Sequence, residues 1–399
     1  MAETRKIMVG QLPIGGGSPI SVQSMTNTDT RDIEATAEQI RQLGLAGCDL
    51  IRISVYDMEC AEAVRRLKGS TRIPLVADIH YDAGLAVAAI ENGIDKLRIN
   101  PGNLSNIREV QKVVDCARQH GTPIRIGVNS GSVPRDILNR DGGVTARGLV
   151  DSAAGHVRLL EKAGFEDIVL SMKASEVRLM VDAYRLAHLT FDYPLHLGVT
   201  ESGLPGQGTL KSAIGIGALL LDGIGDTLRV SLTGSPLPEP QVAIDILRAV
   251  GLRSGLELVS CPTCGRTEVD IEGIARRVQE QTRHITVPIK VAIMGCVVNG
   301  PGEARGADIA LCGGHNGSAL YYQGRFVKKV TDDPVPEVMA MINHFLKSTD
   351  PLEKKNEVNR SFGRNSTPGC PTWRGSYTWH KWSIMRKRER QLHISQPMY

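Results

Sequence analysis

Short hydrophobic stretches alternate with amphipathic stretches of helical period from about residue 20 to residue 250. The hydrophobic stretches are rich in Val, Ile and Leu, as is typical of strands buried on both faces. There are eight of them, at residues 20–25, 50–55, 75–79, 96–100, 124–129, 168–173, 195–200 and 227–232. Helix-like segments lie between them, such as residues 32–45, 58–68, 106–120, 150–163, 176–188 and 210–224.

Strands that alternate with helices predict right-handed βαβ units and a parallel sheet. Eight such units in this length match a (β/α)₈ TIM barrel. An open doubly wound sheet is the alternative. It would place a Gly-rich phosphate turn after its first strand, whereas the run Gly15–Gly17 comes before it. We therefore predict an α/β chain whose residues 1–254 form a TIM-barrel substrate domain.

The pattern changes at about residue 255. A Cys-x-x-Cys motif is followed by a helical stretch at 270–281, an apolar run at 287–298 and a Gly-rich loop. Residues 255–347 are therefore predicted to form a small α+β domain. Residues 348–399 show neither the helical nor the strand period of hydrophobic residues. They contain all three tryptophans and a basic run at 385–390. We expect this segment to be an extension, mostly disordered or docked on a neighbour.

The composition is that of an ordinary globular protein, with 41% hydrophobic and 23% charged residues among 399. The formal net charge of +4 is too small to imply nucleic-acid binding. No signal peptide is evident, and no apolar run reaches the ~18 residues of a membrane span. A cytoplasmic enzyme is the expectation, and in that compartment cysteines are thiols or metal ligands rather than disulfides. Cys48, Cys60 and Cys116 lie in or beside helical patterns and are expected to be buried thiols.

Polar side chains recur at the carboxyl ends of the predicted strands, where barrel enzymes have their active sites. Cations stand on five strands, and only Asp78 and Glu201 are acidic at comparable positions. A cation inside a parallel strand is costly unless it is paired or faces a polar cavity. The excess positive charge predicts an anionic ligand, most simply a diphosphate. The residues concerned are Arg52, Arg98, Asn100, Arg125, Asn129, Lys173, His196, Arg229 and Ser231.

Two further residues near the predicted anion site each have two possible roles. Lys211, near the start of the helix after the seventh strand, is either a phosphate contact or a solvated helix lysine. Glu201 follows the seventh strand and is either a proton donor or a partner for the nearby cations.

Three cysteines form the second candidate site. Cys261 and Cys264 make the Cys-x-x-Cys motif, and Cys296 lies beside a Gly-Pro-Gly loop whose backbone N–H groups can donate to sulfur. Three thiolates suit an iron–sulfur cluster or zinc, and Cys312 or His315 could complete a zinc site. A dithiol oxidoreductase is a third possibility, but no thioredoxin-like pattern precedes the motif.

The combination of motifs resembles the family of bacterial 4-hydroxy-3-methylbut-2-en-1-yl diphosphate synthases of the methylerythritol phosphate route to isoprenoids. The resemblance covers about residues 5–345, with the motifs in the same order along the chain. Residues from about 348 match nothing expected of the family. The chain also lacks the large insert of plant-type relatives. The motifs are residues 22–27 (VQSMTN), 75–80 (LVADIH), 97–103 (LRINPGN), 124–129 (IRIGVN), 195–201 (LHLGVTE), 211–215 (KSAIG), 223–231 (GIGDTLRVS), 261–265 (CPTCG) and 295–303 (GCVVNGPGE).

The resemblance implies a TIM barrel followed by a ferredoxin-like [4Fe–4S] domain, with the cluster held by Cys261, Cys264, Cys296 and Glu303. It implies reductive ring opening of 2-C-methyl-D-erythritol 2,4-cyclodiphosphate, with Glu201 and Glu303 as catalytic residues. Ferredoxin or flavodoxin would supply the electrons, and the enzyme would be a homodimer that closes one subunit's cluster domain over the other's barrel. The implied substrate ligands are Arg52, Arg98, Asn100, Arg125, Asn129, Lys173, His196, Lys211, Arg229 and Ser231.

Two other functions stay open on the residues alone. One is a metal-independent barrel enzyme, such as an aldolase with a Schiff base at Lys173 and a structural zinc domain. The other is an iron–sulfur sensor or assembly protein without catalysis.

Overall fold

A computed structural model describes residues 3–80, 82–99, 107–298 and 300–349. Eight parallel strands form one sheet in the order β8-β7-β6-β5-β4-β3-β10-β9. The amide of Leu170 donates to the Pro194 carbonyl at 2.8 Å and joins the two outermost strands, so the sheet closes into the predicted barrel. The strands are β3 (Ser21–Met25), β4 (Leu50–Ser54), β5 (Leu75–Asp78), β6 (Lys96–Ile99), β7 (Ile124–Asn129), β8 (Ile168–Lys173), β9 (His196–Leu197) and β10 (Thr227–Leu228).

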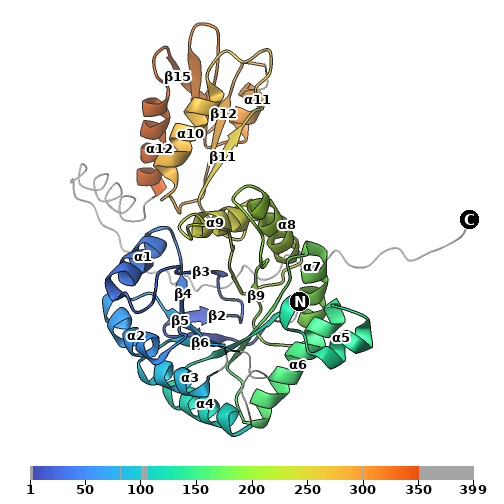
Figure 1. Cartoon of the computed structure of the whole chain (residues 1–399). Helices are drawn as coiled ribbons and strands as arrows, with labels where there is room; N and C mark the ends of the chain where they lie inside the picture. Colours follow the sequence, from blue (N-terminus) through green and yellow to red (C-terminus); the bar gives the residue numbers. More distant parts are fainter. Residues whose placement is uncertain (1–2, 81, 100–106, 299, 350–399) are drawn as a thin grey trace, which may run out of the picture.

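Helices surround the barrel, one after each strand (Figure 1). Strand residues alternate between the helix layer and the interior. In β6, for example, Leu97 and Ile99 belong to the hydrophobic core, whereas Lys96 and Arg98 belong to the opposite face and point into the barrel. The helices are α1 (Ile33–Leu45), α2 (Met58–Ser70), α3 (Ala83–Glu91), α4 (Ile107–His120), α6 (Ala146–Lys162), α7 (Val177–Thr190), α8 (Gln207–Leu221) and α9 (Glu239–Ala249).

The structure adds elements that the pattern did not predict. A hairpin of β1 (Ile7–Val9) and β2 (Leu12–Ile14) precedes the barrel. Its Val9 and Ile14 pack on Leu50 and Val76, near the starts of two strands, so the hairpin plugs the amino-terminal end of the barrel. After β7 the chain forms η2 (Ser130–Ser132) and α5 (Arg135–Asp141).

The Gly-rich run after the hairpin has a structural reason. Gly15 has φ +77°, and a Cβ there would lie 2.2 Å from the Arg5 carbonyl oxygen. Only glycine fits this turn.

The C-terminal domain is the predicted α+β unit. Its sheet has the order β11-β12-β13-β14-β15, in which the first three strands are parallel and the last two pairings antiparallel. The helices α10 and α12 share one hydrophobic core with the sheet. The elements are β11 (Leu256–Ser260), α10 (Ile271–Thr282), β12 (Ile289–Met294), α11 (Gly300–Arg305), β13 (Ile309–Cys312), β14 (Ser318–Tyr322), β15 (Arg325–Val330) and α12 (Val335–Thr349).

Figure 1 shows this domain beside the barrel, next to α9, rather than over the barrel's end. Arg248 Nη2, on α9, donates to the Ile285 carbonyl of the C-terminal domain at 2.9 Å and so links the two units. No helix in the described ranges has the length and apolar character needed to cross a membrane.

Candidate functional site

Asp78 organises two of the predicted cations at the carboxyl-terminal end of the barrel, here called the mouth. Arg98 Nη1 donates to its Oδ1 at 3.2 Å, and Arg52 Nε lies 3.8 Å from Oδ2. His80 Nε2 lies 3.5 Å from the same oxygen. Burial alone would raise the pKa of Asp78, but Arg52 and the contacts with His80 and Arg98 lower it below its usual value. The carboxylate therefore stays charged and holds both guanidinium groups.

Gly127 makes room for one of these groups. A Cβ at this position would lie 2.8 Å from Nε of Arg98. The glycine in the strand motif at 124–129 therefore serves the close approach of a neighbouring guanidinium to the strand.

A second buried carboxylate, Glu239, was missed by the sequence reasoning. It opens α9 and is 2% exposed. It accepts from Ser24 Oγ at 2.7 Å and from the amide of Leu232 at 3.0 Å, and Nε of Arg229 lies 3.4 Å away. Glu239 is therefore a further acid near the cations, and it comes from a helix start rather than from the strand ends at which Asp78 and Glu201 were expected. A signal was present, since the Pro-rich segment 236–240 places an acid at the start of the helix after the last strand.

Arg125 and Lys173 are buried without a carboxylate partner in the described part of the chain. Arg125 is 1% exposed, Nη1 donates to Ser171 Oγ at 3.4 Å, and its Nε lacks a partner there. A Cβ on Gly198 would lie 3.0 Å from Nζ of Lys173, so this glycine again makes room for a cation. Burial, and then the charge of Arg125, lowers the pKa of Lys173.

His196 lies in the same interior and is fully buried. Its Nδ1 is 3.4 Å from Thr227 Oγ1, and its Nε2 has no partner among the described residues. Burial, followed by the charges of Arg125 and Lys173, lowers its pKa well below the usual value. The imidazole is therefore neutral at pH 7, and Nε2 can donate or accept according to its tautomer.

Together these side chains form an anion clamp, the name used below for Arg52, Arg98, Arg125, Lys173 and Arg229. Five basic groups converge, and Asp78 and Glu239 are the two buried carboxylates found against them in the described ranges. Because positive charge exceeds negative charge in a desolvated space, the clamp suits a ligand with several negative charges.

The other predicted substrate ligands are half-buried where the structure describes them. Asn129 is half-buried at the end of β7, Ser231 is half-buried after β10, and Lys211 is half-buried on α8. Asn100 lies outside the described residues. Glu201 is exposed after β9 and has φ +52°, which is uncommon for a side chain of this type. It forms no ion pair with any described residue, so its interpretation as a partner for the cations finds no support there.

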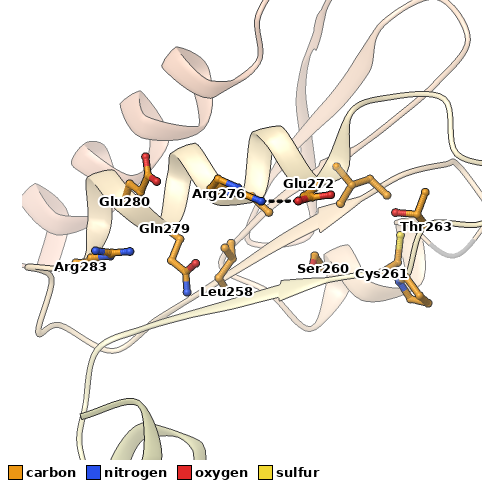
Figure 2. A pocket seen from close by; sticks show the side chains of 12 residues that line it. Leu258, Ser260, Cys261, Thr263, Glu272, Arg276, Gln279, Glu280 and Arg283 are labelled. Atoms are coloured by element: carbon orange, nitrogen blue, oxygen red, sulfur yellow. Dashed lines mark hydrogen bonds and ion pairs between the residues drawn. The ribbon is translucent and has the colours of Figure 1, made fainter. Parts of the chain in front are cut away.

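The predicted cysteine site lies at the carboxyl ends of two parallel strands. Cys261 directly follows β11 and Cys296 lies two residues after β12, and the two strands pair in parallel with Ser260 opposite Ile293. The amide of Gly295 donates to the sulfur of Cys261 at 3.2 Å. Cys264 is exposed, and the backbone N–H of Arg266 lowers its thiol pKa. A groove of about 640 Å³ between α10 and β11 leads to Cys261 (Figure 2).

Cys312 lies behind this site. It ends β13 and is 1% exposed. Burial, followed by the charges of Cys296 and Cys261, raises the pKa of its thiol to about 11. A Cβ on Gly300 would come within 2.6 Å of its sulfur, so the first residue of α11 packs directly against it. The Gly-Pro-Gly residues, expected as a loop, are the start of this helix, and Glu303 is exposed on it.

The described residues contain no group of three or more His, Cys, Asp or Glu side chains that could hold a metal ion. The seven cysteines in the described ranges are free thiols. Cys48 and Cys60 are buried as expected, whereas Cys116 is only half-buried.

Comparison with known proteins agrees with both the barrel and the C-terminal domain. Residues 4–244 match the GcpE TIM-barrel domain, and residues 257–344 match the GcpE protein C-terminal domain. A protein of Caldanaerobacter subterraneus subsp. tengcongensis, named 4-hydroxy-3-methylbut-2-en-1-yl diphosphate synthase (flavodoxin), is 54% identical over 84% of this chain and 94% of its own length. Proteins with the same name from Ruminiclostridium cellulolyticum and Geobacter sulfurreducens are 53% and 50% identical, over 84% and 85% of this chain and 95% and 96% of theirs. The chain belongs to the GcpE family.

Proposed function

We propose that the chain is an iron–sulfur oxidoreductase that converts 2-C-methyl-D-erythritol 2,4-cyclodiphosphate into 4-hydroxy-3-methylbut-2-en-1-yl diphosphate. The product is the compound in the names of its relatives. Two electrons and two protons enter, the ring opens and one water leaves. The observation that carries the proposal is the anion clamp, because five basic groups against two carboxylates match a diphosphate.

In this proposal the clamp binds the two phosphate groups, together with Lys211 at the start of α8. The guanidinium groups offer paired N–H donors, which suit phosphate oxygens. The neutral His196 adds a hydrogen bond through Nε2, the atom without a described partner. Asn100, Asn129 and Ser231 complete the hydrogen bonding at the strand ends.

Glu201 is proposed as the proton donor. It is exposed in the loop after β9, and it forms no ion pair with a described residue. Its left-handed backbone is the kind of strain that is kept at functional sites.

Cys261, Cys264, Cys296 and Glu303 are proposed to hold a [4Fe–4S] cluster. The donor set fits: thiolates are the usual ligands, one cysteine has a lowered pKa, and the sulfur of another accepts a backbone N–H. When bound, such a cluster supplies electrons singly and offers a Lewis-acidic iron. Cys312 has the raised pKa of a buried thiol, and its position against Gly300 supports a packing role.

We further propose a homodimer. Figure 1 shows β11 leading away from the barrel, so the cysteine end of the C-terminal domain lies far from the chain's own mouth. Closure by the domain of a second subunit would bring the two sites together. Ferredoxin or flavodoxin is the proposed electron donor, and flavodoxin appears in the names of the relatives.

Anaerobic purification of the full chain tests the cofactor. We expect about four irons and matching sulfide per chain, with absorbance near ~400 nm that bleaches on reduction. Stoichiometric zinc without iron would overturn the proposal. Turnover of the cyclic diphosphate with dithionite and a dye then separates an enzyme from a sensor.

The Glu303→Gln variant tests the carboxylate ligand. It should keep most of the iron and lose turnover, because three thiolates remain but the exchangeable position changes. Glu257→Gln, an exposed glutamate of the same domain outside the groove, is the matched control. Full activity of Glu303→Gln would contradict the assignment.

A further inference from the structure

A buried lysine that belongs to none of the expected contacts lies below the anion clamp. Lys96 is the first residue of β6 and is fully buried. It stands two residues before Arg98 and so points to the same, inner face. In register it pairs with Val76, which contacts the plugging hairpin, whereas Arg98 pairs with Asp78 at the mouth. Lys96 therefore lies deeper in the barrel than Arg98, on the side of the plug.

Several buried polar atoms of the barrel interior have no partner among the described residues. Within the described residues, Nζ of Lys96 has no hydrogen-bond partner, and both amide atoms of Gln23 and Nε of Arg125 are also unpaired. After burial, the charges of Arg125 and Arg52 lower the pKa of Lys96, and the charge of Lys96 in turn lowers the pKa of His196. A buried amine without a counter-ion, next to guanidinium groups, is more stable without its proton.

We propose that Lys96 is a positioning residue of the anion clamp, uncharged in the empty barrel and protonated when a diphosphate binds above it. The ligand's negative charge offsets the repulsion from Arg125 and Arg52 and makes the ammonium form favourable. The new charge then attracts the ligand without touching it. This inference rests on the proposed function, because it needs an anion in the clamp.

Other groups set the charge that Lys96 experiences. Burial and the nearby guanidinium charges lower the pKa of Lys96, and they act on Lys173 and His196 in the same way. The ligand should therefore draw protons to more than one group, and only a comparison of variants isolates Lys96. The groups that face the interior around it are Arg52 on β4, Asp78 on β5, Arg98 on β6, Arg125 on β7, Lys173 on β8, His196 on β9, Arg229 directly after β10 and Glu239 on α9.

Titration calorimetry with inorganic pyrophosphate tests the proposal on the anaerobic full-length holoenzyme at about pH 7.5. Running it in two buffers of different ionisation enthalpy gives the number of protons taken up. We expect Lys96→Met to take up fewer protons than the wild type, by up to one per chain, and to bind pyrophosphate about tenfold more weakly. Its affinity should also fall less steeply as the pH rises, because one coupled proton is missing.

Lys162→Met, which removes an exposed lysine from α6, is the matched control and should leave both quantities unchanged. Lys96→Met should melt at or above the wild-type temperature, since the amine it removes is buried and unpaired. If it does not fold, Lys96→Gln is measured instead. A folded variant with wild-type affinity and proton uptake would overturn the inference. Failure of the wild type to bind pyrophosphate would instead count against the proposed function.

Discussion

Replacing Gly127 with alanine should weaken anion binding while leaving the fold largely intact. The new Cβ would lie 2.8 Å from Nε of Arg98, and ordinary contact begins at 3.4 Å, so the guanidinium must move by at least 0.6 Å. That shift disturbs its 3.2 Å bond to Asp78 and its place in the clamp. One misplaced charge-assisted hydrogen bond costs about 1.5–3 kcal/mol, or about 10- to 100-fold in affinity.

The fold should tolerate the change because the clash is with the end of a flexible side chain, and Gly127 has no left-handed backbone. Pyrophosphate titration and the KM for the cyclic diphosphate measure the effect, with thermal unfolding as the check on folding. Gly131→Ala is the matched control, since a Cβ there meets nothing within 4 Å. Wild-type affinity in a folded Gly127→Ala protein would refute the assignment of Arg98 to the clamp.

Three further predictions concern stability and the cysteine site. Asp78→Asn leaves two guanidinium groups without their shared carboxylate and should cost about 3–5 kcal/mol in urea unfolding; a loss below ~1 kcal/mol would contradict the pairing. Burial lowers the pKa of His156 in the folded chain to about 4, whereas an exposed imidazole titrates near ~6.5. As the pH drops, the unfolded chain therefore binds a proton first, and the free energy of unfolding falls by about 3 kcal/mol between pH ~6.5 and ~4. His156→Leu should remove this part of the pH dependence, and an unchanged stability profile would argue against it. Gly300→Ala places a Cβ 2.6 Å from the Cys312 sulfur and should lower the iron content of the purified protein. In the control Gly302→Ala the new Cβ meets nothing within 4 Å, so the iron content should not change. Equal iron content in both variants would contradict the packing of Gly300 against Cys312.

The strand and helix pattern predicted the barrel well because its strands are buried on both faces. The runs at 124–129 and 168–173 coincide with β7 and β8. The last two strands are shorter than predicted, with two residues each in β9 and β10. There Gly198 lies close to the next strand, where a Cβ would be 2.7 Å from the Arg229 carbonyl oxygen. Hydrophobic pattern shows that a segment is buried, but it does not show how far regular pairing extends.

Site residues on the strands could be predicted, because side chains alternate between the two faces of a strand. Site residues that tertiary contacts bring in from other elements were missed. Alternation placed Arg52, Arg98 and Arg229 on inner faces. Glu239 comes from a helix start, and its role depends on folding back against β3 and β10, as its contacts with Ser24 and Arg229 show. The plugging hairpin was missed for a similar reason, since two three-residue strands carry too little periodicity to be recognised.

The charged interior also explains how such a barrel can remain folded. Each buried, unpaired charge costs several kcal/mol, and a folded domain has only about 5–15 kcal/mol to lose. The guanidinium groups of Arg52, Arg98 and Arg229 are therefore paired with Asp78 and Glu239. Burial and the neighbouring guanidinium charges lower the pKa values of Lys96, Lys173 and His196, because an amine or imidazole becomes neutral at a smaller cost than an uncompensated charge. In the proposal for Lys96, the barrel interior therefore carries less charge before an anion binds. Entry of a multiply charged anion reverses that balance, so binding energy and proton uptake should rise together.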